Sequence, residues 1–376
     1  MSGTNPKTAI VSVINDLVTD QRVARTCALL TELGFNVLLV GRNRKHSAPL
    51  PQKAWKMHRM GLLFSKGPFF YAEFNIRLLL FLIFRKAGLL VPNDLDTLLP
   101  NFIIHKIKRI PLVYDSHEFF TETPEVIHRP WVRAVWLNIE KRILPRLKTM
   151  ITVNDSLAGI FSRKYGIQVI PVRNVPMLYE KVTAFSYNEM GIPEGTKIIL
   201  LQGSGINIQR GAEELVESME YLTNTMLLII GSGDVLELLK QLARKPCIDG
   251  KVRFLPRMPL EELRKYTASA DLGLSLDKDT CPNYHFSLPN KIFDYIHAGT
   301  PVLASPLPEV KRILHDYGVG RCIRSHEPKS LAADIQDLLD QPEILREYRQ
   351  NCLKVRTSLC WENEKQLLIP LYAKYL

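Results

Sequence analysis

The segment "KTAIVSVINDLVTDQRVARTCALLTELGFNVLLVGR", residues 7–42, decides the fold because it contains a strand, a helix and a second strand in succession. Residues 7–14 form a short apolar run rich in β-branched side chains, which is typical of a buried strand. Residues 20–34 repeat apolar side chains at helical spacing behind Asp20, a suitable N-cap. Residues 36–42 are again largely apolar. A unit of this kind predicts a parallel sheet with a right-handed crossover.

The same alternation continues along the 376 residues and predicts two domains. Residues 174–197 have no clean period and several turn residues, so we expect them to link the domains. Further strands are expected at 112–115, 150–153, 169–172, 198–205, 226–234, 252–256, 272–276, 301–305 and 318–323. We predict an α/β protein of two Rossmann-like, doubly wound domains, 1–180 and 196–360, which face a central cleft. Ligands are expected at the carboxyl ends of the strands.

The net charge of +11 is confined to the amino-terminal half. Residues 1–190 hold 26 Lys and Arg against 14 Asp and Glu, whereas residues 191–376 hold 23 against 24. A one-sided basic field attracts polyanions such as an acidic membrane face, a phosphorylated acceptor or nucleic acid. A basic surface kept for solubility is the alternative. Nucleic acid is not expected, because no recognition motif is present and aromatic residues do not interleave with the basic ones.

The cysteines and the amino terminus predict a cytoplasmic protein. The six cysteines show neither a C-x-x-C pair nor metal-ligand spacing with histidine, which is typical of free thiols in a reducing compartment. The first residues, "MSGTNPKTAIVSVI", lack the pattern of an export signal. A peripheral position on the inner face of the cytoplasmic membrane is compatible with this expectation.

The most apolar segment is "FFYAEFNIRLLLFLIFRKAGLLV", residues 69–91. Its longest uncharged run, residues 78–84, is far shorter than the roughly 18 residues needed to cross a bilayer. A core helix is one interpretation. The other is an interfacial helix in which Arg77, Arg85 and Lys86 meet lipid headgroups.

The segment "FSLPNKIFDYIHAGTPVLAS", residues 286–305, predicts a helix with an anion site at its start. Ser287 is a suitable N-cap and Pro289 suits the first turn. The free N–H groups of that turn, together with Leu288 backbone and the Lys291 ammonium, would bind phosphate. Asp294, one turn later, could accept hydrogen bonds from ribose hydroxyls. A capped amphipathic helix with an incidental Lys–Asp pair is the alternative.

Two glycine loops follow strands in the same half and add to this site. The first, "QGSGINIQRG", contains Gly203, Gly205 and Gly211, and Arg210 lies at the head of the following helix. The second, "GSGD", contains Gly231 and Gly233. Glycine loops after strands let the backbone approach a diphosphate, and an arginine fork can bind phosphate oxygens. One such loop alone is weak evidence, because turns also need glycine.

The order of "GSGINIQRG", "GSGD" and "SLPNKIFDYIHAGTPV" resembles the nucleotide-sugar half of GT-B glycosyltransferases, in particular retaining family 4. In the amino-terminal half, "NDLVTDQRV", "NDLDTLLP", "YDSHEFF" and "RNVP" resemble a bacterial branch of that family that builds envelope polysaccharides such as lipopolysaccharide. The resemblance implies a hexosyltransferase that uses a UDP- or GDP-sugar. It also implies that the last segment, 361–376, packs back onto the first domain.

The resemblance assigns roles to individual residues. Arg210 and Lys291 would bind the donor diphosphate and act in catalysis, and Asp294 would hold the ribose. His117 resembles a histidine that reaches the transferred sugar, although it could instead only order its own loop. Phe286 stands where relatives carry the first acidic residue of an E-x7-E signature, and Gly205 stands where many carry a second basic residue. Residues expected on the acceptor side are Asn15, Asp16, Asp94 and Asp96.

Two acidic triplets, residues 94–96 and 277–279, mimic the D-x-D metal motif of another glycosyltransferase architecture. Mg²⁺ could bind such carboxylates. We expect no metal site and no cofactor, because fixed cations and helix termini can do the metal's work in GT-B enzymes.

The sequence thus predicts a cytoplasmic glycosyltransferase that moves a sugar from a nucleotide-sugar to a saccharide or lipid-diphosphate-linked acceptor, with retention. The alternatives are a sugar-nucleotide epimerase of the same architecture and a non-catalytic binding protein that uses its basic half. Donor, acceptor, linkage and oligomeric state stay open.

Overall fold

The chain divides into two compact α/β units. The computed structural model describes residues 7–18, 20–45, 47–180 and 182–376. Unit 1 contains residues up to Asn174 and returns with Glu364–Leu376, and unit 2 is Val175–Asn363. The boundary therefore lies at 174/175, earlier in the chain than the expected limits of 180 and 196, because most of the turn-rich segment belongs to unit 2.

Unit 1 is built on parallel strands in the order β3-β2-β1-β4, continued by β5-β6-β7. Two isolated parallel bridges, Leu90 with Leu112 and Asn93 with Asp115, connect the two groups. The strands are β1 (Thr8–Ser12), β2 (Asn36–Arg42), β3 (Lys56–Met60), β4 (Leu89–Pro92), β5 (Tyr114–Ser116), β6 (Thr149–Thr152) and β7 (Gln168–Pro171). The helices are α1 (Gln21–Glu32), α2 (Gly67–Ile83), α3 (Leu95–Lys108), α4 (Pro124–Ile127), α5 (Pro130–Ile143) and α6 (Asp155–Tyr165).

Unit 2 has one six-stranded parallel sheet in the order β10-β9-β8-β11-β12-β13. This is the doubly wound order in which the sequence reverses direction beside the first strand. The strands are β8 (Lys197–Gly203), β9 (Thr225–Gly231), β10 (Val252–Leu255), β11 (Leu272–Ser275), β12 (Val302–Ala304) and β13 (Gly320–Cys322). The helices are α7 (Tyr187–Met190), α8 (Ala212–Ser218), α9 (Leu236–Leu242), α10 (Leu260–Ser269), α11 (Pro282–His285), α12 (Asn290–Ala298), α13 (Pro308–Tyr317), α14 (Pro328–Leu339) and α15 (Pro342–Val355). The prediction of doubly wound α/β architecture is confirmed.

The last helix, α16 (Trp361–Ala373), joins unit 1 over most of its length. Lys365 pairs with Glu32 of α1 at 2.9 Å, and the backbone N–H of Arg173 donates to the Glu364 carboxylate at 2.8 Å. The Tyr372 side chain is fully buried, and the Lys7 ammonium donates to the carbonyl of Tyr375. Residues 364–376 therefore complete the core of unit 1.

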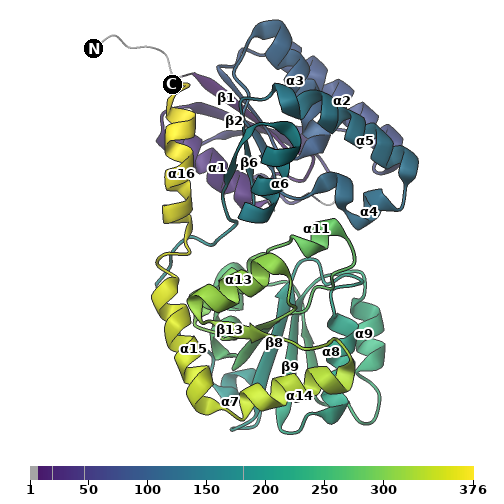
Figure 1. Cartoon of the computed structure of the whole chain (residues 1–376), viewed down its shortest axis with the longest axis vertical. Helices are drawn as coiled ribbons and strands as arrows, with labels where there is room; N and C mark the ends of the chain where they lie inside the picture. Colours follow the sequence, from purple (N-terminus) through teal and green to yellow (C-terminus); the bar gives the residue numbers. More distant parts are fainter. Residues whose placement is uncertain (1–6, 19, 46, 181) are drawn as a thin grey trace. The chain divides into compact units, whose positions relative to one another are not determined.

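The apolar segment 69–91 is divided between two elements. Residues up to Ile83 form α2, whose Phe70, Phe74, Leu78 and Leu82 are buried, and Leu89–Pro92 form the buried strand β4. In Figure 1, α2 lies beside α3 and α5. The core-helix interpretation thus describes one face of α2 only, because Phe69, Ile76 and Leu80 on the other face are exposed. Within the described residues, no helix is both long enough and apolar enough to cross a bilayer.

Candidate functional site

Helix α12 is fixed to the sheet of unit 2 by Tyr295. The Tyr295 hydroxyl donates to the carbonyl oxygens of Leu200 in β8 and Leu274 in β11, both at 3.1 Å, and accepts from the Gln202 N–H. Its ring lies over Gly273, where an added Cβ would stand 2.5 Å from the ring. Because Lys291 precedes Tyr295 by about one helical turn, this anchor also positions the start of α12 at the carboxyl ends of the strands.

The first turn of α12 is open. The cap residue is Pro289, which provides no side-chain hydrogen bond to the turn. The expectation that Ser287 caps the helix is wrong, because its hydroxyl donates to the Tyr284 carbonyl at 2.8 Å instead. Leu288 packs against the apolar core of unit 2. Pro289 therefore gives the first amide N–H groups of α12 no side-chain acceptor, which suits the positive end of the helix dipole to an anion.

Two cations meet one buried carboxylate beside this helix start. Arg210 pairs with the fully buried Asp277 at 3.0 Å, and its guanidinium lies 4.3 Å from the centre of the Tyr284 ring. Burial lowers the pKa of Lys291, an effect that Arg210 increases and Asp277 opposes. The Arg210 Nε has no hydrogen-bond acceptor among the described residues. With Lys291 protonated, the cluster carries one net positive charge, and the Arg210 Nε is an unused donor.

The two glycine loops pack against each other at the ends of β8 and β9. An added Cβ at Gly231 would lie 1.8 Å from the Gly203 carbonyl oxygen, and one at Gly233 would lie 1.8 Å from that of Ile206. Backbone bonds from Ser232 N to Gly203 O and from Ile206 N to Ser232 O join the loops. Gly231 and Gly233 therefore allow the two loops to pack together, because any side chain there would collide with backbone. Gly205 has room for a side chain, since the nearest atom to an added Cβ is a side-chain amide nitrogen at 3.9 Å. Gly211 has a φ of 70° and abuts the Leu276 carbonyl, which brings Arg210 next to Asp277.

The remaining residues of the predicted donor site lie on or beside α12. Asp294 is half-buried, and its charge adds to burial in raising the pKa of Tyr179 to about 12. Phe286 ends α11, and its ring contacts the edge of His285 with centroids 4.5 Å apart. His285 in turn contacts Asp279 at 2.8 Å. The position that carries an acid in relatives is thus part of a small aromatic contact in this chain.

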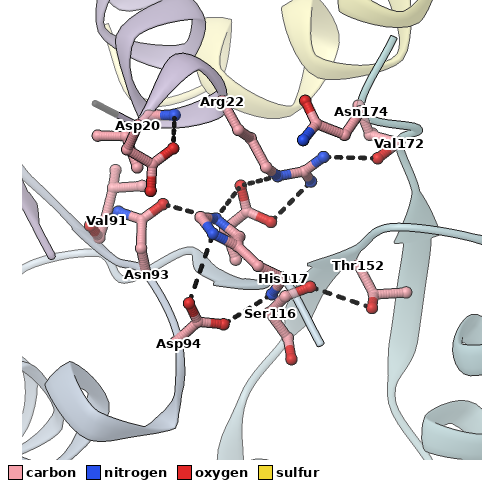
Figure 2. A network of polar contacts seen from close by, with 12 residues as sticks. Asp20, Arg22, Val91, Asn93, Asp94, Ser116, His117, Thr152, Val172 and Asn174 are labelled. Carbon is pink, nitrogen blue, oxygen red and sulfur yellow. Dashed lines mark hydrogen bonds and ion pairs between the residues drawn. The ribbon is translucent and has the colours of Figure 1, made fainter. Parts of the chain in front are cut away.

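Unit 1 has its own polar network at the carboxyl ends of β4 and β5 (Figure 2). The His117 imidazole lies 3.1 Å from Asn93 Oδ1, 3.4 Å from Asp94 Oδ2 and 3.6 Å from Asp115 Oδ2. Arg22 of α1 donates twice to the Asp115 carboxylate, at 2.8 and 3.1 Å, and once to the Val172 carbonyl. Three elements distant in sequence therefore fix the histidine.

His117 is positively charged at neutral pH. Burial lowers its pKa, but the Asp94 and Asp115 carboxylates more than offset this effect and raise the pKa to about 9. Burial raises the pKa of Asp115, whereas the larger combined effect of Arg22 and His117 holds it below its ordinary value. The imidazolium can thus donate from either nitrogen to an oxygen, but it is not a general base at this pH.

Asp94 holds a strained backbone conformation. Its φ of 58° and ψ of 164° fall in a region that is essentially restricted to glycine and costs on the order of 1–3 kcal/mol. The backbone N–H of Asp94 donates to the Asp115 carbonyl oxygen at 2.9 Å. The Asp94 carboxylate accepts a hydrogen bond from the backbone N–H of His117 at 2.8 Å. Strain of this kind persists where the surroundings impose it, which is typical of functional sites.

The other residues expected on the acceptor side differ in their surroundings. Asp16 accepts hydrogen bonds from Arg59 at 2.7 Å and from the hydroxyl of Ser47, so it anchors a loop. Asn15 is exposed. Asp96 is buried, and one of its carboxyl oxygens has no hydrogen-bond partner among the described residues. Burial, with the charge of Asp94, raises the pKa of Asp96 well above its ordinary value.

Residues 186–355 match the family described as glycosyl transferases group 1. This part of the chain is similar to that family, and we call it the group 1 domain below. Among curated proteins, the D-inositol 3-phosphate glycosyltransferase of Nocardioides sp. is 24% identical over 203 residues, which cover 49% of this chain and 43% of that protein. The chain spans about half the length of the first curated relatives it matches.

Solved structures show the fold of the chain beyond the group 1 domain. Sucrose-phosphate synthase from Thermosynechococcus elongatus has a TM-score of 0.81 at 17% identity, with 98% of each chain covered. Anabaena HepE in complex with UDP and glucose has a TM-score of 0.74 at 14% identity, with 98% of this chain and 100% of that chain covered. The predicted GT-B fold is confirmed.

Sequence reasoning did not identify two residues of the group 1 domain that the geometry brings to the site. Asp277 pairs with Arg210, and Tyr295 anchors α12. Asp277 belongs to the triplet 277–279, whose other members are paired with Glu214 and His285. An acid directly after a buried strand is a signal that could have indicated Asp277. In unit 1, Arg22 gave no signal, because an arginine within a helix pattern normally faces solvent.

Proposed function

We propose that the protein is a retaining glycosyltransferase of family 4 that transfers a hexose from a UDP- or GDP-sugar to an acceptor hydroxyl in bacterial envelope polysaccharide synthesis. The observation that carries the proposal is the pair of cations, Lys291 and Arg210, beside Asp277 at the open start of α12. One net positive charge, unused N–H donors and a helix N-terminus together suit a diphosphate.

The proposed reaction needs no nucleophile from the protein. The bond between the anomeric carbon and the donor phosphate oxygen breaks, and a bond from that carbon to the acceptor oxygen forms on the same face. The acceptor proton passes to the departing diphosphate. Lys291, Arg210 and the first N–H groups of α12 would stabilise the charge that develops on the leaving group. Asp294 would accept hydrogen bonds from the ribose.

The proposed acceptor is a saccharide, free or carried on a lipid diphosphate, and unit 1 would bind it. Excess positive charge in this half suits a phosphorylated acceptor. The imidazolium of His117 adds a positive charge, and the exposed Asn15 adds a neutral donor and acceptor.

We further propose that turnover requires no divalent metal. Asp277 is paired with Arg210, and Asp94 holds His117, so both acidic triplets are engaged with cationic groups. Turnover should be unchanged by EDTA. Loss of turnover that Mg²⁺ restores would contradict this proposal.

Nucleotide binding is the direct test. Thermal unfolding should be measured with UDP, GDP, UMP and inorganic phosphate, because a ligand at about 100 times its Kd stabilises the folded state by about 2.7 kcal/mol. Stabilisation by one nucleoside diphosphate and not by its monophosphate is expected. No stabilisation by either diphosphate would contradict a donor site. Conversion of a UDP-sugar without any acceptor would instead indicate an epimerase.

A further inference from the structure

Helix α2 is apolar on two opposite faces. Its buried face carries Phe70, Phe74, Leu78 and Leu82, spaced four residues apart, which pack into unit 1. Its exposed face carries Phe69, Ile76, Leu80 and Ile83, at spacings of seven, four and three residues. These spacings place all four on one line of the helix, a stripe about 21 Å long. A helix of a water-exposed surface normally has a polar outer face.

The stripe is extended at both of its ends. At the start of α2, Leu63 and Phe64 are exposed, and the Phe64 ring lies 5.5 Å from that of Phe69. At the other end, Phe84 is 83% exposed. Ile107 at the end of α3 is also exposed, and its neighbour Lys108 donates to the carbonyl oxygens of Leu82 and Ile83. We name this set the α2 face: Leu63, Phe64, Phe69, Ile76, Leu80, Ile83, Phe84 and Ile107.

The segment of sequence around α2 is rich in basic residues and poor in acidic ones. Residues 33–114 hold 13 Lys and Arg against three acidic residues, Glu73, Asp94 and Asp96. The two aspartates belong to the network described above. Glu73 is engaged by the N–H groups of Leu63 and Phe64 and by Arg77. The exposed charges at the end of α2 and α3 are therefore cationic: Arg85, Lys86, Lys106, Lys108 and Arg109.

We propose that the α2 face docks on the surface of an anionic lipid membrane. An exposed apolar stripe of this length, bordered by cations, matches the pattern of helices that lie in the interface with their apolar side in the acyl boundary. Each Lys or Arg near an anionic leaflet adds to the attraction, and the Arg and Lys stems can extend from apolar contacts to headgroups. A second copy of this chain would bring the same cations together, which is unfavourable.

The proposal concerns unit 1 and does not depend on the reaction proposed above. Vesicle flotation should therefore be measured with the full chain and without any nucleotide. Vesicles of phosphatidylcholine with 30% phosphatidylglycerol, a composition of our choice and roughly that of an anionic leaflet, are compared with phosphatidylcholine alone. The protein should float with the anionic vesicles only, and binding should weaken as salt is raised because exposed charges are screened.

Substitutions separate the apolar and the charged contributions. Ile76 and Leu80 are 59% and 50% exposed, so Ile76→Ser with Leu80→Ser should lower the partition coefficient by roughly tenfold to hundredfold. Arg85→Glu with Lys86→Glu should lower it by at least about fivefold for each charge. Leu238→Ser, at a comparably exposed position in unit 2, and Lys329→Glu are matched controls that should leave binding unchanged.

Two results would overturn the proposal. The first is that the unsubstituted protein does not float with anionic vesicles, or that the α2 variants float as it does. The second is a dimer in sedimentation that Ile76→Ser with Leu80→Ser converts to a monomer, without vesicle binding by either form. The thermal unfolding midpoint of every variant should match that of the unsubstituted chain, since all of the substituted side chains are exposed.

Discussion

Replacing Lys291 by methionine tests the proposed donor site most directly. The substitution keeps an unbranched apolar stem of similar length and removes the ammonium. In the unsubstituted protein, Lys291 and Arg210 carry two positive charges beside the single carboxylate of Asp277. Without the ammonium, the remaining pair is neutral, and only Arg210 and the first N–H groups of α12 face the anion.

The expected loss follows from the role of a single charged donor. Removing one group that stabilises charge developing in a transition state costs on the order of 10² to 10³ in kcat, or about 2.7–4 kcal/mol. Lys291→Met should fall in this range. Affinity for the nucleotide-sugar should fall as well, although less, because the ground state carries less charge at the bond that breaks than the transition state does.

Stability should change in the opposite direction. Since burial lowers the pKa of Lys291 below 10.5, the folded state binds this proton less tightly than the unfolded state does. Between the pKa of Lys291 in the folded state and 10.5, the unfolded state therefore binds more protons than the folded state does. In this interval the stability of the unsubstituted protein rises with pH. Because burial disfavours the charged lysine, Lys291→Met should be at least as stable as the unsubstituted protein at pH values below this interval.

Turnover, nucleotide affinity and chemical unfolding should be measured on Lys291→Met and on Lys329→Met, which removes an exposed lysine of unit 2. The control should behave as the unsubstituted protein in all three. Unchanged turnover of Lys291→Met would refute the assignment. A loss of turnover with an equal loss of stability would show that Lys291 acts through the fold and not on the diphosphate.

Three further predictions concern the networks that hold the two sites. The pKa of His117 measured by NMR should be about 9. The stability that its charge contributes should be fully present below about pH 6.5 and should be lost as the pH rises through 9. Asp94→Asn should lower this pKa, and an unchanged pKa would contradict the ion pair between the two residues. Arg22→Met should destabilise unit 1 by about 3–5 kcal/mol in urea unfolding, because it leaves the buried Asp115 carboxylate without its main partner. Recovery of stability when Asp115→Asn is added would support this reason. A loss of less than about 1 kcal/mol for Arg22→Met would refute it. Tyr295→Phe should lower the free energy of unfolding by about 1–3 kcal/mol, since the Gln202 N–H and two carbonyl groups lose a partner in the core. Nucleotide affinity should fall too. A variant as stable as the unsubstituted chain would show that the hydroxyl does not anchor α12.

The spacing of apolar residues predicted those strands and helices in which the apolar side chains are the buried ones. The strand expected at 36–42 has these bounds in the structure, and Asp20 caps α1 by accepting the Val23 N–H. Strand β3 was not predicted, because "KMHRM" lies at the edge of the sheet and has few apolar side chains. The start of α12 was misjudged, because the Ser287 hydroxyl finds the nearby Tyr284 carbonyl and leaves Pro289 as the cap.

The sequence predicted a residue of the site only where that residue stands beside a local sequence pattern that can be recognised. Lys291 and Arg210 stand next to recognisable helix starts and glycine loops, so their positions indicated an anion site. Their common partner Asp277 lies 67 residues from Arg210 in the chain, and no local pattern records such a pairing. The same is true of Arg22 and Asp115, which are separated by 93 residues. Tertiary contacts of this kind require the fold before they can be identified.

The division of the chain has a consequence for the order in which the protein folds during synthesis. Unit 2 is an insertion within unit 1, since unit 1 is interrupted at Asn174 and resumes at Glu364. Ribosomes release the amino terminus first, yet the core of unit 1 lacks Tyr372 until residues 364–376 have been synthesised. Unit 2 therefore has its whole sequence available before unit 1 does. A chain that ends at residue 363 and has left the ribosome should present a folded unit 2 and an unfinished unit 1, and such a species is exposed to chaperones and proteases.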